Sequence, residues 1–193
     1  MARYRPLMDD VTRLALAAGQ GDRVALCGLV RATQVNVWRF CAHLAGRDEA
    51  DDLTQETYLR VFRNLRSFRQ DSSARTWLLS ITRHVCMDEL RQRVRRRRRD
   101  ARLFTRGGDE PMYGDATDQA EMRELLSHLD ADRRAAFVLT QLIGLSYDEA
   151  AAVCRCPVGT IRSRVARARA DLITALDLAP ATDDPPAARW SKK

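Results

Sequence analysis

Apolar residues recur every three or four positions through most of this 193-residue chain, and that is the repeat of an amphipathic α-helix. Glycine and proline number only 9 and 6, so few positions interrupt the repeat. No segment has the alternation of apolar and polar residues that a half-buried strand requires. The sequence therefore predicts an all-α protein, whose helices bury their apolar stripes against one another.

The helical repeat fails inside the chain over residues 100–117, which are rich in glycine and aspartate. Such a composition is typical of a flexible linker, so we expect two small helical domains joined by a tether. The expected parts are an N-terminal extension (1–21), a first domain (22–99), the linker (100–117), a second domain (118–178) and a tail (179–193). The tail is rich in proline and aspartate and is expected to be disordered.

Three helices are predicted in the first domain. They span about residues 22–44, 48–65 and 72–90, and polar residues able to cap them stand at their first positions: Asp22, Asp48 and Ser72. Gly46 is placed to end the first helix. The extension before Asp22 has some helical pattern but no assignable role.

The second domain is predicted to contain a helix-turn-helix. Helices over about residues 119–129 and 131–143, the latter capped by Asp130, precede it. Ser146 and Glu149 then have the spacing of a capping box, which opens a short helix. Pro157 follows a tight turn, at a position where proline favours the start of the next helix. Two helices across such a turn form the unit that many DNA-binding proteins use.

The helix after Pro157 has one apolar and one basic side. Its core stripe, read at 100° per residue, is Ile161, Val165, Ala168 and Leu172. The other side carries small residues among arginines, with no acidic residue from 158 to 170, and could enter a major groove. The candidate DNA contacts there are Thr160, Arg162, Ser163, Arg164 and Arg167. A solvated basic helix in an ordinary bundle is the alternative.

The charge balance also favours a polyanionic partner. The 33 basic and 26 acidic residues leave a net charge of +7, which points most simply to nucleic acid. Almost every basic residue is arginine, which suits phosphates and guanine edges but also fits a GC-rich genome. Seven arginines lie within residues 91–99. Arg91 and Arg95 are therefore candidates for phosphate contacts, and a disordered basic linker is the alternative.

Three segments together resemble the sigma-70 family of bacterial transcription factors. Residues 51–58, Asp-Asp-Leu-Thr-Gln-Glu-Thr-Tyr, are similar to the acidic motif that engages the RNA polymerase clamp. Residues 68–78, Phe-Arg-Gln-Asp-Ser-Ser-Ala-Arg-Thr-Trp-Leu, resemble the segment that reads the promoter −10 element. Residues 146–164 are similar to the −35-reading module. With only these two domains, the chain resembles the extracytoplasmic-function (ECF) group.

The resemblance implies a sigma factor that binds core RNA polymerase, at the β′ clamp and the β flap. Its clamp contact would be one exposed side of the second helix: Asp52, Gln55, Glu56, Leu59 and Arg63. An acidic strip around an exposed leucine suits a basic, partly apolar protein surface and is poorly suited to DNA. The alternative is an ordinary solvated face, because acidic residues are favourable near any helix start. An anti-sigma protein is a further partner to consider.

The resemblance also implies that promoter DNA is bound as duplex at −35 and as a non-template single strand at −10. Stacking an unpaired base on an aromatic ring contributes about 1–3 kcal/mol, which would offset part of the cost of flipping it. The candidate −10 contacts are Phe68, Arg69, Gln70, Asp71, Ser72, Arg75, Trp77, His84, Arg91 and Arg95. Histidine at 84 departs from the small polar residue common there, and core packing is the alternative role for Trp77.

No catalytic constellation, cofactor motif or metal-ligand spacing occurs in the sequence, so we expect a protein that is not an enzyme and uses no cofactor or metal. Five cysteines are too few and odd in number for a disulfide scaffold. Cys154 and Cys156 are predicted to pack in the helix-turn-helix turn, with redox sensing or metal binding as alternatives. The chain lacks an apolar segment of about 20 residues and a signal peptide, which predicts a cytoplasmic protein, nucleoid-associated when bound to polymerase.

Two other functions remain compatible with the residues. A stand-alone helix-turn-helix regulator would bind duplex DNA tightly without polymerase or an unpaired strand. An interaction protein would instead clamp a regulatory partner between its two domains. Changing Arg162 and Arg167 to glutamate separates these possibilities, because promoter use would be lost while simple clamping would survive.

Overall fold

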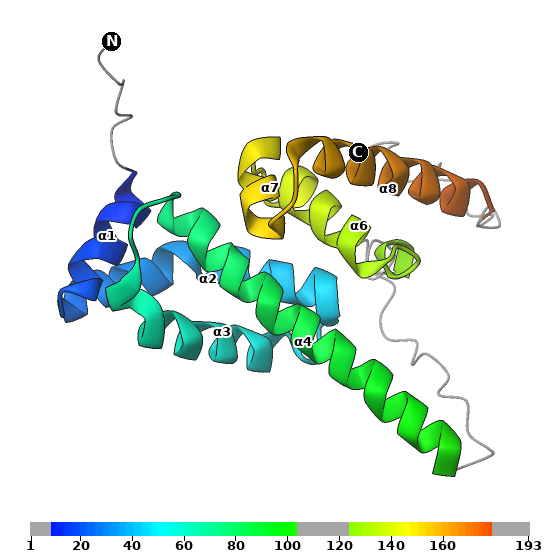
Figure 1. Cartoon of the computed structure of the whole chain (residues 1–193), viewed down its shortest axis with the longest axis horizontal. Helices are drawn as coiled ribbons and strands as arrows, with labels where there is room; N and C mark the ends of the chain where they lie inside the picture. Colours follow the sequence, from blue (N-terminus) through cyan, green and yellow to red (C-terminus); the bar gives the residue numbers. More distant parts are fainter. Residues whose placement is uncertain (1–8, 104–123, 179–193) are drawn as a thin grey trace, which may run out of the picture.

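The computed structural model describes residues 9–103 and 124–178, and within these ranges the regular structure is helical throughout, without a strand. The prediction of an all-α protein with two helical regions is confirmed. The elements in chain order are α1 (Asp10–Gly19), α2 (Arg23–Ala45), α3 (Ala50–Asn64), the 3₁₀ turn η1 (Leu65–Ser67), α4 (Ala74–Leu103), α6 (Ala131–Phe137), the π-helical η2 (Val138–Leu142), α7 (Tyr147–Cys154) and α8 (Val158–Leu178) (Figure 1).

Helices α1 to α4 pack into the first module around α2. Phe40 and Leu44 of α2 are wholly buried, in one hydrophobic cluster with Val61 of α3 and Leu78 of α4. As predicted, Asp22 caps α2 by accepting bonds from the amides of residues 24 and 25, at 2.8 and 3.0 Å. Gly46 ends α2 with φ at 113°, a left-handed conformation in which glycine avoids strain.

The extension before Asp22 contributes α1, which packs against α2 and the start of α4. Ala15 of α1 is wholly buried. The hydroxyl of Thr12 accepts a 2.9 Å hydrogen bond from the amide of Ala74, the first residue of α4. Because an initial amide of a helix has no intrahelical partner, α1 helps to fix where α4 begins.

Two helix starts in the first module differ from the prediction. Helix α3 begins two residues after Asp48, and its N-cap residue Glu49 makes no side-chain capping bond. For α4 the cap is Ser73 rather than Ser72, since the Ser73 hydroxyl accepts from the amide of Thr76 at 3.2 Å. Adjacent serines are equally able to cap, so the sequence alone could not choose between them.

Helix α4 also continues through the arginine run to Leu103, four residues into the predicted linker. Arginine is a good helix former, and pairs one turn apart support the extension. Arg93 bonds Glu89 at 3.1 Å, and Arg96 bonds Gln92 at 3.3 Å. The rest of the predicted linker and the predicted tail lie outside the described residues.

The second module contains the predicted helix-turn-helix, formed by α7 and α8. Asp130 caps α6 as predicted. The helix expected over residues 131–143 instead becomes π-helical at Val138, where the amide of Ile143 bonds the carbonyl of Val138 at 2.9 Å. The predicted core stripe of α8 is buried at Ile161, Val165 and Ala168.

The capping box at the start of α7 is formed in both directions. The Glu149 amide donates to the Ser146 hydroxyl at 3.2 Å, and the Ser146 amide donates to the Glu149 carboxylate at 2.9 Å. We expect Ser146→Ala to lower the free energy of unfolding by about 1 kcal/mol, as measured by urea denaturation. Ser146→Asp should recover most of this loss because aspartate also caps well. An equal loss in both variants would assign the effect to something other than the cap.

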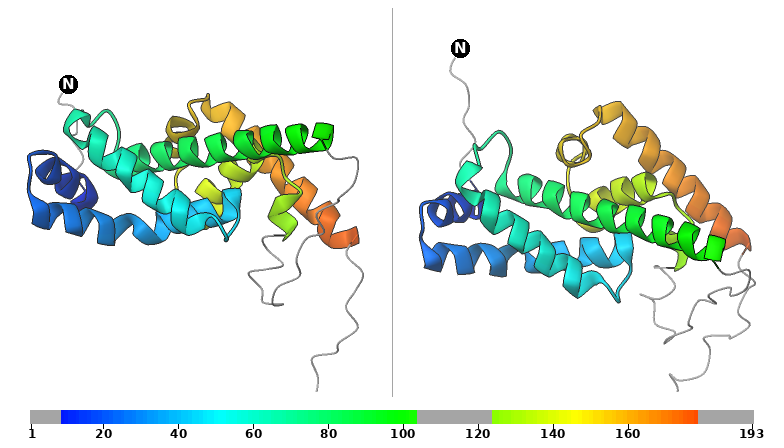
Figure 2. Two further views of the ribbon diagram at one scale, coloured as in Figure 1. Left: turned by 90° about the horizontal axis from the view of Figure 1, so that it is seen from below. Right: turned by 60° about the horizontal axis from the view of Figure 1, so that its bottom comes forward.

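The two modules lie against each other in this structure. Helix α7 packs on α4, and the C-terminal end of α2 contacts α6, so buried residues of both modules form one hydrophobic cluster. The end of α4 extends beyond the helices of the first module, as Figures 1 and 2 show.

Candidate nucleic-acid and protein interfaces

One side of α3 presents an acidic and apolar surface, here called the α3 face. It consists of Asp52, Gln55, Glu56, Leu59, Phe62 and Arg63. All are exposed except Glu56, which is half-buried. Leu59 is 49% exposed and Phe62 is 41% exposed, so Phe62 belongs to this face although its helical spacing favours the buried side. The predicted polymerase contacts therefore lie together, with a phenylalanine ring beside the exposed leucine.

Arg60, at the border of the α3 face, holds one of its carboxylates in place. Its Nε donates to Glu56 at 2.8 Å, and its Nη1 donates to Asp88 of α4 at 3.2 Å. The bond to Glu56 is the main reason that the pKa of Arg60 lies above its ordinary value. Asp52 stands one turn earlier on the same side, so the face keeps its acidic character.

The predicted base-stacking aromatic, Phe68, is paired with Trp77. Their ring centroids lie 5.1 Å apart with the planes at 42°, and both side chains pack against the hydrophobic core. Core packing is therefore part of the role of Trp77. The next three residues of the loop, Arg69, Gln70 and Asp71, are exposed. Gln70 has φ at 61°, a left-handed conformation that is costly for this residue type and that often occurs at functional sites.

Other predicted −10 residues are more enclosed. Ser72 and His84 are half-buried, and Nδ1 of His84 lies 3.0 Å from the carbonyl oxygen of Ser80, one turn earlier. Arg75 is also half-buried, and its Nη2 donates to the carbonyl of Ile143 in the second module at 2.6 Å. In this arrangement of the modules, the guanidinium of Arg75 is occupied by protein.

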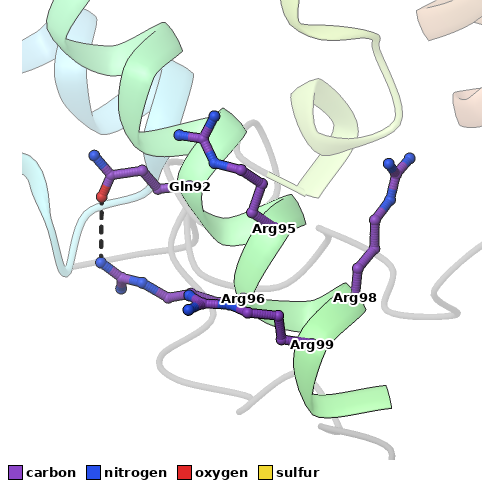
Figure 3. Close-up of a pocket in the computed structure, with 5 residues that line it drawn as sticks. All are labelled: Gln92, Arg95, Arg96, Arg98 and Arg99. Atoms are coloured by element: carbon purple, nitrogen blue, oxygen red, sulfur yellow. Dashed lines mark hydrogen bonds between the residues drawn. The ribbon is translucent and has the colours of Figure 1, made fainter. Parts of the chain in front are cut away.

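The arginine run forms an exposed basic rod at the end of α4. Arg95, Arg96, Arg98 and Arg99 surround an open surface pocket of about 630 Å³ with Gln92, and their guanidinium groups spread outward from the helix (Figure 3). Because the run is helical, its arginines have fixed positions relative to one another. In a disordered linker, the alternative considered from the sequence, they would not. At 1.5 Å per residue, Arg95 lies about 27 Å along the axis from Trp77.

The outer side of α8 has the predicted basic character. Arg162, Ser163 and Arg167 are exposed, and Thr160 is half-buried. Gly159 has open space where a Cβ would stand, so a DNA backbone can approach this end of the helix closely. Arg162 and Arg167 are thus the two exposed arginines among the predicted −35 contacts.

Arg164 differs from its neighbours on α8 because it turns toward the protein. Its side chain is 23% exposed and bonds Asp132 at 2.7 Å, and its Nη1 lies 3.7 Å from the sulfur of Cys156. Asp132 also accepts a 2.6 Å bond from Arg83 of α4. One carboxylate therefore joins the first module to the helix-turn-helix.

Two further arginines bind the C-terminal end of α2, where helix carbonyls lack partners. Arg93 of α4 donates to the carbonyl of Ala45 at 2.7 Å, and Arg134 of α6 donates to the carbonyl of Leu44 at 3.1 Å. Burial lowers the pKa of Arg134. The Arg93 bond lies within the first module, whereas the Arg134 bond, with those of Arg75 and Asp132, forms the module interface. Sequence reasoning missed it because the partners are up to 90 residues apart and no local pattern links them.

Residues 9–103 and 124–178 hold no cluster of three or more histidine, cysteine or acidic residues able to bind a metal ion. Across that same part of the chain, no helix has the length and apolarity to cross a bilayer. Cys154 packs in the turn between α7 and α8, where burial raises the pKa of its thiol to about 11. Cys154 therefore stays a neutral thiol at physiological pH.

Comparison with known proteins matches two separate segments of the chain. Residues 29–96 match the model of Sigma-70 region 2, and residues 119–172 match that of Sigma-70 region 4. The chain is 50% identical over 173 residues to the ECF RNA polymerase sigma factor SigC of Mycobacterium tuberculosis, covering 86% of this chain and 90% of that protein.

Two solved structures are also similar to this chain. CnrH, in complex with the cytosolic domain of CnrY, superposes with a TM-score of 0.69 at 30% identity, covering 88% of this chain and 98% of that one. The sigma factor RpoE of Bartonella quintana, in complex with the anti-sigma factor NepR, superposes with a TM-score of 0.67 at 30% identity. This match covers 80% of this chain and 98% of that one. The chain belongs to the sigma-70 family. Within that family it is an ECF sigma factor, a regulatory subunit that directs RNA polymerase to promoters.

Proposed function

We propose that the α3 face is the surface with which this sigma factor binds the β′ clamp of core RNA polymerase. The observation that carries the proposal is that exposed Asp52 and half-buried Glu56 share one side of α3 with the exposed side chains of Leu59 and Phe62, in a chain of net charge +7. Acidic groups would pair with a basic partner, and the two apolar side chains would be buried at the centre of the contact, where binding energy concentrates. DNA would be repelled by this surface.

The DNA contacts that we propose lie on two other surfaces. The exposed side of α8, chiefly Arg162 and Arg167, would enter the −35 major groove. The loop over residues 68–72 and the start of α4 would take up unpaired bases of the −10 element, with Phe68 and Trp77 forming one wall. Arg91 and Arg95 would bind phosphates farther along α4. Because both arginines are exposed on one helix, they support a contact in fixed register.

Promoter opening in this scheme depends on polymerase, and the sigma factor itself performs no catalysis. We propose that it acts in the cytoplasm and becomes nucleoid-associated when bound to polymerase. The relative RpoE was solved with an anti-sigma factor, so we also propose control by a partner of that kind. The second domain would contact the β flap.

The decisive variant is Asp52→Arg with Glu56→Arg, which reverses the charge of the α3 face. We expect affinity for core polymerase to fall at least about 100-fold, because like charges brought together across an interface cost several kcal/mol. Binding is measured by fluorescence anisotropy with purified core polymerase. Abortive transcription on a library of host promoter fragments should lose initiation at the shared two-element sequence that the wild type uses.

The matched control is Asp10→Arg with Glu124→Arg, which makes the same change in net charge at exposed sites away from α3. An equal loss in the control would assign the effect to overall charge and contradict the proposal. Wild-type protein that supports no initiation but binds duplex DNA tightly without polymerase would instead indicate a stand-alone regulator.

A further inference from the structure

Two cysteines that none of these surfaces uses meet in the core of the first module. Cys41 of α2 and Cys86 of α4 are both 0% exposed. Their sulfur atoms lie 3.7 Å apart, with the Cys86 thiol donating to the Cys41 sulfur, although the residues are 45 positions apart in sequence. Exposed Cys27 and the turn cysteines Cys154 and Cys156 take no part in this pair.

The surroundings make the two thiols unequal. The hydrogen bond from Cys86 lowers the pKa of Cys41 despite its burial. The same hydrogen bond and burial raise the pKa of Cys86. Since the thiolate is the reactive form, Cys41 is the sulfur suited to attack an oxidant, and Cys86 is the neighbour placed to react with it next.

We propose that Cys41 and Cys86 are an oxidisable pair, which a hydroperoxide converts into a disulfide joining α2 to α4. In the first step the Cys41 sulfur attacks one peroxide oxygen and the O–O bond breaks. Cys41 becomes a sulfenic acid, and the other oxygen leaves as water with the proton of Cys41 when the oxidant is hydrogen peroxide. In the second step the Cys86 sulfur attacks the sulfenic sulfur, the S–S bond forms and the S–O bond breaks. The hydroxyl leaves as a second water with the proton of Cys86.

The geometry requires only a local movement. A disulfide has an S–S distance of about 2.05 Å, so the sulfurs must approach by about 1.7 Å. The crosslink would close a loop that contains α3 and the turn at residues 65–73, and therefore both the α3 face and the proposed −10 loop. Closing a loop of this length restricts the unfolded chain. We expect the midpoint of thermal unfolding to rise by about 10 °C on oxidation.

The test uses the full chain with Cys27, Cys154 and Cys156 changed to alanine, so that only the pair remains. Folded protein is treated with hydrogen peroxide, unfolded in an alkylating agent and analysed by peptide mass spectrometry. We expect a peptide linking Cys41 to Cys86, a higher unfolding midpoint, and reversal of both by dithiothreitol. Cys86→Ser in this background should leave a Cys41 sulfenic acid that dimedone traps.

The same peptide mass spectrometry on the wild-type chain gives the test without substitutions. Exposed Cys27 then serves as an internal reporter of oxidation. If Cys27 is oxidised while Cys41 and Cys86 both remain alkylatable, the proposal is wrong. It is equally overturned if the crosslink forms only in denaturant, or if Cys41 proceeds to sulfinic acid without joining Cys86. None of these results bears on polymerase binding, which is measured separately.

Discussion

Arg162→Glu combined with Arg167→Glu should weaken holoenzyme binding to a duplex −35 element by about 1,000-fold while leaving affinity for core polymerase unchanged. Both side chains are exposed on α8, outside the buried stripe. A good arginine contact to a base contributes about 1–3 kcal/mol of discrimination, and a loss of about 4 kcal/mol over two sites corresponds to 1,000-fold. Anisotropy titration of labelled promoter fragments measures this loss.

The salt dependence gives a second readout of the same variant. Each lost phosphate contact should make the slope of log affinity against log salt shallower by about 0.9. The control is Arg31→Glu with Arg39→Glu, an equal charge change at exposed positions of α2. If the control loses as much affinity as the α8 variant, the effect comes from the overall field of the protein. An unchanged affinity in the α8 variant would remove α8 from the groove.

Asp132→Arg should separate the two modules. Asp132 accepts bonds from Arg83 at 2.6 Å and Arg164 at 2.7 Å, and the side chains of these arginines are only 16% and 23% exposed. A third arginine there would leave both of them unpaired against a like charge. Breaking a fully buried ion pair costs 3–5 kcal/mol, and partial exposure of Asp132 reduces this to about 2–3 kcal/mol through solvent screening.

Two measurements would detect the separation of the modules. Small-angle scattering should give a larger radius of gyration, and amides on the side of α4 that packs on α7 should exchange faster, with helix content unchanged. Asp148→Arg reverses an exposed charge in the same module and should leave both readouts unaltered. Arg83→Asp with Asp132→Arg should restore part of the contact by exchanging its charges. Unaltered scattering and exchange in Asp132→Arg would show that Asp132 does not hold the modules together.

The features that could be predicted from sequence are those that depend on interactions between residues close together in the chain. Asp22, Asp130 and the Ser146–Glu149 box cap their helices as expected because a cap and its amides are neighbours in the chain. The buried stripe of α8 follows from helical spacing alone. The whole length of α4 could not be predicted, because a dense run of arginines also occurs in disordered chains.

Features that depend on distant partners could not be predicted. Phe62 has the spacing of a buried residue, yet it is 41% exposed, because none of the helices that the structure describes covers that side of α3. Arg164 lies among DNA-facing candidates in sequence but bonds Asp132, 32 residues away. Nothing near either residue in sequence indicates these surroundings. The resemblance to a known family suggested candidate surfaces, but it could not show which side chains the free protein uses internally.

The bond from Arg75 to the carbonyl of Ile143 sets a condition on promoter binding by the free protein. If Arg75 contacts the −10 element as proposed, closed molecules cannot make that contact, and only the open fraction is competent. The apparent dissociation constant is then the intrinsic one divided by that fraction. An open population of about 1% would weaken promoter affinity about 100-fold. Polymerase that binds the two modules at separate sites would remove this penalty, so transcriptional output would follow the opening equilibrium as well as protein concentration.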